Sequence, residues 1–464
     1  MKRIVSITIR TVSYALVGVF ILLFVAFYAL QLPEVQTQLS NSAMHWLSER
    51  LGGNVSVSKV RITWFDEVVF EDLNIKDSQD RNMIYVREVY VDASTNLSFN
   101  PANLFEYEPG QGWKSLKFKP GKMIRFDNNL DFVTLNNPEA RFIRDKKGML
   151  NFDYWLLEID KLTKKEKRGK KPVKPFTLDN VNIKDGIVSI VTEHSKRHTD
   201  GTFDFANFEF RNLNARLEQL SFKRDTILMV SKNLSARDGF SALEIRNATG
   251  RFFHCRKGIR LDNFQAKLND SHLQNRLYFS YNRPSDFGDF FNKVHIDADL
   301  RNSVLQAKDI GLFIPLMQSF KEEYKINSRL NGTVASLELR DMTVDFGRGS
   351  RVTGNAKLTG LPELKTTHSV LDLKPSVLLA ADIAQYSANE KFREYIAKVE
   401  RLDFSGTFNG VYNDFQSRPR LISPRLGEIV GEVNVKAKGQ LEYSGNLLVN
   451  QFKIGELLDN PQLD

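Results

Sequence analysis

The sequence predicts a mainly β protein that one N-terminal helix holds to a membrane. Three observations support this fold class. An uncharged segment covers residues 11–32, an amphipathic helical pattern follows at 33–53, and apolar residues then alternate with polar ones in many short segments. The expected order is a transmembrane helix, a short amphipathic helix and a sheet of short strands.

Composition limits the classes of protein to which the chain can belong. Its 464 residues allow two or three ordinary domains or one repetitive domain, and the mean hydropathy of -0.34 places most of the chain outside a membrane. The single cysteine, Cys255, excludes a scaffold of intrachain disulfides. The net charge of +9 suits anionic headgroups as well as nucleic acid, so it does not choose between them.

Residues 1–32 are expected to form a cytoplasmic stub and an uncleaved signal anchor. The segment TVSYALVGVFILLFVAFYALQL would form a helix about 33 Å long, enough to cross a hydrocarbon core of about 30 Å. Lys2, Arg3 and Arg10 precede it and Glu34 follows it, so the chain after Pro33 is expected beyond the membrane. The candidate anchor side chains are Val12, Leu16, Val19, Phe20, Leu23, Phe24 and Phe27.

An amphipathic helix is expected at 33–53. Val35, Leu39, Ala43, Leu47 and Leu51 recur at every fourth residue, and two glycines end the pattern. Such a helix either caps the end of a sheet or lies on the membrane surface.

Two β regions, 54–160 and 176–464, are expected on either side of a basic linker loop. NVSVSKVRITWF (54–65) alternates and slips by one place after Ser58, and similar alternation recurs at 84–94, 186–191, 239–245, 276–282, 293–302, 343–360 and 432–445. Only 151–162, 309–320 and 388–402 have helical patterns. A long sheet with one apolar face must close on itself, pack on a partner or curl around an apolar guest.

The basic loop covers residues 161–175, KLTKKEKRGKKPVKP, with eight basic residues and one acidic residue. A solvated loop and a contact with anionic headgroups or another polyanion are both open. Without interleaved aromatic residues or a helix-turn-helix or zinc-finger spacing, nothing supports nucleic acid as a partner.

No motif predicts catalysis, a cofactor or a metal. Asp345-Phe346-Gly347 spells a kinase tripeptide without the other kinase motifs, and His194 and His198 in HSKRH lack further ligands. We therefore expect a protein that is not an enzyme.

The order of segments resembles the AsmA-like proteins and, among them, the TamB family of translocation and assembly modules. The resemblance rests on the anchor, the helix ending SERLGG, the strands from NVSVSK to VYVDA, and the segments 135–156, 175–190, 330–362 and 404–436 with LLVNQFKIGELLDNP after them. It covers most of the chain. The family is not defined by catalytic residues, so none carry over.

The resemblance implies a periplasmic β-taco, an elongated and curled antiparallel sheet with an apolar groove, anchored to the inner membrane. It implies phospholipid transport between the inner and outer membranes, and an outer-membrane barrel protein of the TamA/BamA type as a partner. TamB-type chains run further, so the sequence is expected to be a fragment or a shorter AsmA-like protein.

Two hairpins supply the candidate groove side chains. Val344 and Phe346 share one face before the turn at 347–349, and Val352, Ala356 and Leu358 share one face after it. Nearer the C-terminus the candidates are Val433, Val435, Ala437, Leu441 and Tyr443. These faces line a lipid path or form an ordinary packed core.

Three functions remain open. The first is a lipid conduit, in which acyl chains are the apolar guest. The second is a factor for assembly of outer-membrane barrels or autotransporters, which would receive client strands by β-augmentation. The third is a eukaryotic type II ectodomain, suggested by sequons at Asn54, Asn96, Asn233, Asn247 and Asn331 and disfavoured by the lack of disulfide cysteines.

Overall fold

A computed structural model describes most of the chain after residue 53. The described residues are 54–63, 67–92, 97–99, 105–106, 117–118, 124–126, 129–157, 176–193, 195–223, 226–255, 257–387, 389–438, 440–460 and 462, with a few single residues between 17 and 44. The three topology charges, most of the expected anchor and amphipathic helix, and the basic loop lie outside this set. Of the anchor candidates, Phe20 and Phe24 are described, and both are helical and exposed.

Within the described residues, no helix combines the length and the apolar character that a membrane crossing requires. The transmembrane helix therefore stays a prediction.

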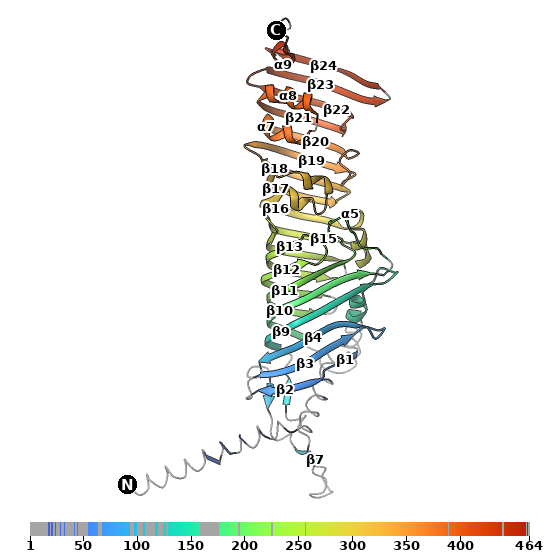
Figure 1. The fold of residues 1–464 in the computed structure, drawn as a ribbon, viewed down its shortest axis with the longest axis vertical. Coiled ribbons are helices and arrows are strands. Elements are labelled where there is room, and N and C mark those ends of the chain that lie inside the picture. The colour runs from blue at the N-terminus through green and yellow to red at the C-terminus, as the bar shows by residue number, and fades with distance from the viewer. Residues whose placement is uncertain are drawn as a thin grey trace, which may run out of the picture. The chain divides into compact units, whose positions relative to one another are not determined.

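The prediction of a mainly β protein is confirmed. Twenty strands form one sheet, in which each strand from β12 onward pairs in antiparallel with the strand that follows it (Figure 1). Among the described strands, β24 (Gln440–Asn450) pairs only with β23 (Gly427–Lys438), so the sheet is open at this edge.

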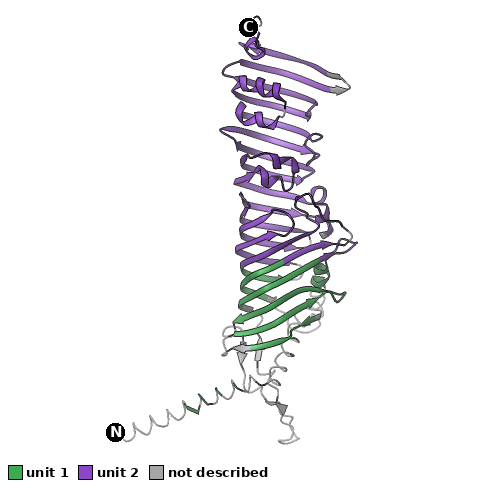
Figure 2. Cartoon of the chain, viewed as in Figure 1, with its two compact units in different colours: residues 1–142, 151–187, 216–225 green, residues 143–150, 188–215, 226–464 purple. Residues whose placement is uncertain are grey.

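The chain divides into two compact units, and the boundary passes through β9 (Asn129–Arg144), β10 (Phe176–Thr192) and β11 (Phe208–Lys223) (Figure 2). Unit 1 comprises residues 1–142, 151–187 and 216–225. Its strands of the main sheet are β1 (Asn54–Ser56), β2 (Lys59–Thr63), β3 (Glu67–Lys76), β4 (Asn82–Asp92) and most of β9 (Asn129–Arg144). Four short strands form two separate pairs, β5 (Leu97–Phe99) with β8 (Ile124–Phe126) and β6 (Phe105–Glu106) with β7 (Lys117–Phe118).

Unit 1 contains a packed hydrophobic core. Apolar residues of β3 and β4, among them Val68, Phe70, Val86 and Val89, are buried together. The slip predicted after Ser58 is confirmed, because β1 and β2 are separate strands that both pair with β3.

A helix at residues 151–157 packs on a second hydrophobic cluster of unit 1. Trp155 and Leu156 pack there against Ile75 and Met83.

Unit 2 comprises residues 143–150, 188–215 and 226–464. Its strands after β11 are β12 (Thr226–Asp238), β13 (Glu244–Cys255), β14 (Gly258–Leu268), β15 (Ser271–Ser280), β16 (His295–Gln306), β17 (Glu323–Thr333), β18 (Ser336–Phe346), β19 (Ser350–Thr359), β20 (His368–Leu379), β21 (Arg401–Val411), β22 (Asp414–Ser423), β23 and β24. The predicted segment 239–245 is mostly a turn between β12 and β13, because Asp238 accepts hydrogen bonds from the backbone of Phe240 and Ser241.

Because the strands of unit 2 alternate in direction, their connections lie at two opposite strand ends, here called rim 1 and rim 2. Rim 1 holds the connections at 256–257, 281–294, 334–335, 360–367 and 412–413. Rim 2 holds those at 193–207, 239–243, 269–270, 307–322, 347–349, 380–400, 424–426 and 451–460.

Most helices of unit 2 lie at rim 2. They are α6 (Ala307–Ile310), η5 (Pro315–Ser319), α7 (Ala380–Ile383), η6 (Ala384–Tyr386), α8 (Glu390–Val399) and α9 (Ile454–Leu458). Rim 1 carries η4 (Pro284–Asp289) and α5 (Phe290–Lys293) (Figure 1). The helices predicted at 309–320 and 388–402 are confirmed in part, as short helical turns and as α8.

Candidate functional site

The strand register sorts the candidate groove residues onto one face of the sheet. Cross-strand partners share a face, and Val344 lies opposite Val352 while Phe346 lies opposite Ser350. On the same ladder Ala356 lies opposite Leu339, and Leu358 lies opposite Leu337. The five candidates of this hairpin therefore share the face that alternation predicted for them.

This face continues from strand to strand. Successive cross-strand partners from β12 to β23 are Met229, Phe252, Leu261, Leu277, Ala298, Leu330, Leu339, Ala356, Leu371, Phe408, Ser417 and Val433. Eleven of these twelve are apolar. We call this side of the sheet the apolar face.

The opposite side, here called the polar face, has a different composition. It is formed by the chain neighbours of the apolar partners. On strands β14 to β23 these neighbours, which also lie opposite one another, are Arg260, Tyr278, Asp297, Asn331, Glu338, Lys357, Val370, Asn409, Gln416 and Asn434. Ion pairs run along this face, such as Arg276 with Asp297 at 2.7 Å and Arg340 with Glu338 at 2.9 Å. Exposed pairs of this kind add little stability, but they keep the face soluble.

Small residues occupy the middle of the apolar face. Ser328, Gly354 and Ser376 are buried there, between larger side chains on both sides. A Cβ on Gly354 would lie 2.2 Å from the carbonyl oxygen of Asp372. Close to these residues, most pairs of adjacent strands from β13 to β21 contain a register shift, the mark of a β-bulge. Such bulges bend strands.

Several large side chains on the apolar face between β17 and β22 are only half-buried, although Met342 is buried. Val344, Phe346, Leu371 and Phe408 all belong to this class. Their state differs from the core of unit 1, where Val68 is fully buried. This part of the apolar face is therefore partly accessible.

Three candidates depart from that pattern. Val435 and Ala356 are 6% and 5% exposed, so neighbouring side chains cover them, whereas Tyr443, the partner of Val435 on β24, is 70% exposed. The backbones of Ala437 and Leu441 pair with each other, and their side chains lie outside the described set. Val433 is half-buried.

An aromatic group at rim 2 gives Phe346 protein neighbours that alternation did not predict. Its ring lies 6.0 Å from Tyr324 and 6.5 Å from Tyr386, which in turn contacts Phe320 at 4.8 Å. The hydroxyls of Tyr324 and Tyr386 are 2.7 Å apart. Burial, and then this hydrogen bond, raise the pKa of Tyr386 well above its usual range, so the phenol stays neutral.

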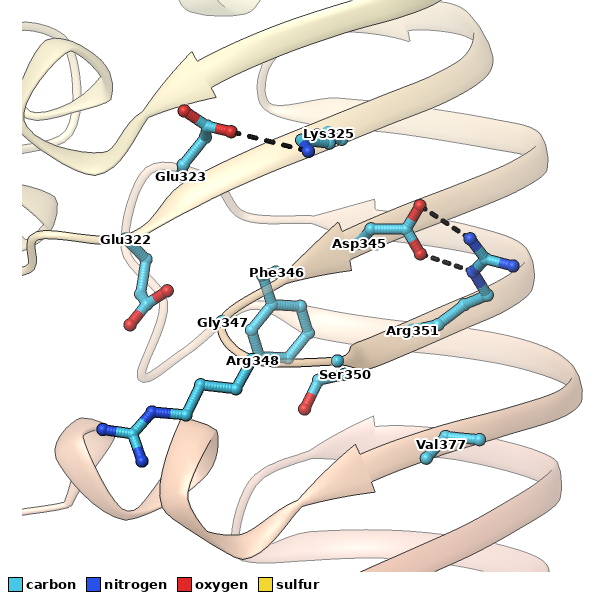
Figure 3. Close-up of a pocket in the computed structure, with 11 residues that line it drawn as sticks. Glu322, Glu323, Lys325, Asp345, Phe346, Gly347, Arg348, Ser350, Arg351 and Val377 are labelled. Carbon is cyan, nitrogen blue, oxygen red and sulfur yellow. Dashed lines mark hydrogen bonds and ion pairs between the residues drawn. The ribbon is translucent and has the colours of Figure 1, made fainter.

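A surface cavity of about 530 Å³ lies beside this aromatic group (Figure 3). Among its charged side chains, Asp345 pairs with Arg351 and Glu323 with Lys325, and Glu322 and Arg348 add one charge of each sign. The tripeptide Asp345-Phe346-Gly347 forms the corner of the β18–β19 hairpin. The cavity therefore has a mixed, internally compensated charge.

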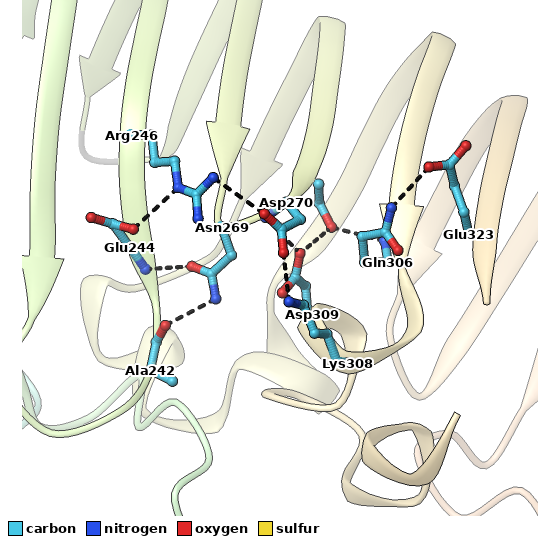
Figure 4. Close-up of polar contacts among 10 residues, drawn as sticks. Ala242, Glu244, Arg246, Asn269, Asp270, Gln306, Lys308, Asp309 and Glu323 are labelled. Carbon is cyan, nitrogen blue, oxygen red and sulfur yellow. Dashed lines mark hydrogen bonds and ion pairs between the residues drawn. The ribbon is translucent and has the colours of Figure 1, made fainter. Parts of the chain in front are cut away.

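A second polar group lies at rim 2 between β14 and α6 (Figure 4). Asp270 contacts Lys308 at 2.5 Å and Arg246 at 3.2 Å, and the hydrogen bond from Lys308 is the main reason why the pKa of Asp270 lies below its ordinary value. Beside it, Asp309 accepts a hydrogen bond from Ser271. These contacts fix α6 to the sheet.

The described part of the chain holds no group of three or more His, Cys, Asp or Glu side chains arranged for a metal ion. Cys255 is a half-buried free thiol at the end of β13. The apolar face is therefore the most extensive candidate site in unit 2. No known protein family, curated protein or solved structure matches the chain.

Proposed function

We propose that this chain is a non-enzymatic protein of outer-membrane biogenesis that carries phospholipid along its apolar face. In this proposal residues 11–32 anchor it in the inner membrane, the N-terminus is cytoplasmic, the chain after residue 32 is periplasmic, and the lipid moves between the inner and outer membranes. The observation that carries the proposal is the ladder of apolar cross-strand partners from β12 to β23, half-buried over much of its length.

Acyl chains fit this face for a physical reason. Burying each methylene is worth about 0.8 kcal/mol, and a face that stays apolar from strand to strand lets a lipid move without losing that gain. The small residues and bulges in the middle of the strands support a sheet that curls toward its apolar face. The result would be a groove of the β-taco kind.

Neighbouring residues of β20 allow a matched test. Leu371 is half-buried on the apolar face, and Val370 is 42% exposed on the polar face. In the full chain, Leu371→Asp should abolish co-purifying phospholipid, measured by mass spectrometry, with little change in thermal unfolding. Val370→Asp should change neither. Equal lipid in both variants and the wild type would contradict the proposal.

The topology is tested separately. A reporter enzyme that works only in the periplasm should be active when it is fused after Asp464, because Lys2, Arg3 and Arg10 retain the N-terminus in the cytoplasm. Activity of a cytoplasm-dependent reporter at the same position would exclude the periplasmic location.

The open edge of β24 favours a second function, assembly of outer-membrane barrel proteins or autotransporters. Leu447, Leu448 and Val449 are all more than half exposed along this strand. An edge strand of this kind can pair with a strand of another chain, such as a client or a barrel partner of the TamA/BamA type. Crosslinking from Leu448 to a client in cells would support this function.

A further inference from the structure

Phenylalanine rings join two segments of unit 2 that come from opposite ends of the strands. The ring of Phe205 stacks on that of Phe290, with centroids 4.3 Å apart and an angle of 3° between the planes. Phe205 also lies 6.1 Å from Phe291, 5.0 Å from Phe203 and 5.8 Å from Phe313. We call these five rings the clasp.

The two sides of the clasp belong to different rims. Phe203 and Phe205 lie in the connection between β10 and β11, and Phe313 follows α6, all at rim 2. Phe290 and Phe291 form the start of α5 at rim 1. A straight strand as long as the ten-residue β15 would separate its two ends by about 33 Å. The clasp therefore joins segments that belong to opposite ends of the strands.

Each side of the clasp is fixed to its own rim. At rim 2, the buried Asp204 accepts hydrogen bonds from the backbone of Ala206 and Asn207, and the backbone of Phe203 donates to Leu312 O at 2.9 Å. At rim 1, the backbone of Ala335 donates to Phe291 O at 2.9 Å. Hydrogen bonds therefore hold each ring-bearing segment to its own rim, and the ring contacts join the two segments.

The clasp lies against the apolar face. Phe290 contacts Phe279 of β15, which shares that face with Leu277, at 5.6 Å. Near the clasp, Phe264 and Leu300 are less than a tenth exposed, whereas Leu371 farther along the sheet is half-buried. Leu277 itself is half-buried, like Leu371, so the ring contacts over Phe279, rather than a difference in exposure, define where the clasp covers the face.

We propose that the clasp is a gate that closes the apolar face to lipid between β11 and β16 until its rings separate. This inference rests on the proposed lipid transport. An acyl chain can take the place of the ring contacts, because methylenes that pack against the freed rings replace the apolar area lost when the rings part. The hydrogen-bonded backbone segments at the two rims would stay in place while the rings move.

Photocrosslinking in the full chain tests the gate. A benzophenone amino acid replaces either Leu277 on β15, beside the clasp, or Leu371 on β20, far from it. Crosslinking to radiolabelled phospholipid in vesicles is then measured for each position. In otherwise wild-type protein we expect strong labelling at 371 and weak labelling at 277. Phe205→Ala with Phe290→Ala should raise labelling at 277 by about threefold to tenfold and leave 371 unchanged.

Phe253→Ala is the control, because Phe253 lies on the polar face beside Arg260 and the change removes a phenylalanine ring outside the clasp. It should leave both signals unchanged. Phe205→Leu retains most of the apolar volume, serves if the double variant fails to fold, and should give a smaller rise at 277. Equal labelling at 277 and 371 in wild-type protein, or no rise in the folded clasp variants, would overturn the gate. No labelling at either position in any variant would instead overturn lipid transport.

Discussion

The hydroxyl of Ser350 donates a hydrogen bond to Asp382 Oδ2 at 2.7 Å and so ties the start of β19 to helix α7. Asp382 also accepts hydrogen bonds from the backbone N–H groups of Arg348 at 2.9 Å and Ser350 at 3.2 Å. Both side chains are buried. A buried carboxylate needs such donors, so this pair is a fixed point of rim 2.

Removing the hydroxyl should destabilise unit 2. Ser350→Ala leaves one oxygen of Asp382 with fewer donors, and a lost bond to a buried charged acceptor costs about 1–3 kcal/mol. Urea unfolding followed by circular dichroism should show this loss. Ser336→Ala, at an exposed strand start on rim 1, is the control and should change the free energy of unfolding little. Equal effects of the two substitutions would show that the Asp382 contact adds no stability.

Gly347 is required at the same corner for two reasons. Its φ is +62°, and an added Cβ would lie 2.2 Å from Cγ of Asp382. Gly347→Ala should therefore cost more than the roughly 1 kcal/mol expected from the backbone conformation alone. Gly201→Ala is a matched control, because Gly201 has a φ of +80° with no atom near its Cβ position. Unfolding of the two variants should differ, and equal losses would mean that the collision is relieved without cost.

The Ser350–Asp382 pair has a counterpart that the sequence contains but that alternation does not reveal. The hydroxyl of Ser271 donates a hydrogen bond to Asp309 Oδ2, also at 2.7 Å. The two aspartates lie in SVLQAKDI (303–310) and SVLLAADI (376–383), which share five residues in register plus the final isoleucine. A search for internal repeats would have found this pair and predicted equivalent helical turns after β16 and β20.

Local patterns predicted the strands and the Gly347–Gly349 turn, because alternation and glycine act within a few residues. They also placed Val344 with Phe346, and Val352 with Ala356, on one face of each strand. They did not predict the clasp, since Phe205 and Phe290 are 85 positions apart and only the folded sheet brings their rings together. Nor did they predict that Val435 is covered, which depends on neighbouring strands.

Acid should weaken unit 1 through Asp77. Burial alone would raise the pKa of its carboxyl, but hydrogen bonds from Arg81, Asn151 and Gln79 outweigh burial and hold the pKa below the ordinary value of 3.8. The stabilisation is therefore complete well above pH 3.8 and is lost as pH falls through the lower, folded-state pKa.

Asp77→Asn tests this dependence. Its loss of stability relative to wild type should be largest near pH 7 and should shrink below pH 3.8, as measured by chemical unfolding at each pH. Asp80→Asn is the control, since the Asp80 side chain is exposed. A constant difference between Asp77→Asn and wild type at every pH would show that the carboxylate charge does not matter.

Val435 and Tyr443 are cross-strand partners with opposite exposures, and this contrast separates a packed site from an accessible one. Val435→Asp places an unpaired charge among covering side chains, which costs several kcal/mol. Hydrogen exchange of the β23 and β24 amides should then rise sharply. Tyr443→Asp changes a side chain that is already in water, so exchange should stay close to that of wild type. If Val435→Asp instead left the exchange unchanged while phospholipid was lost, the valine would line an accessible lipid path, because only a side chain without a packed partner can accept a charge at no cost to folding.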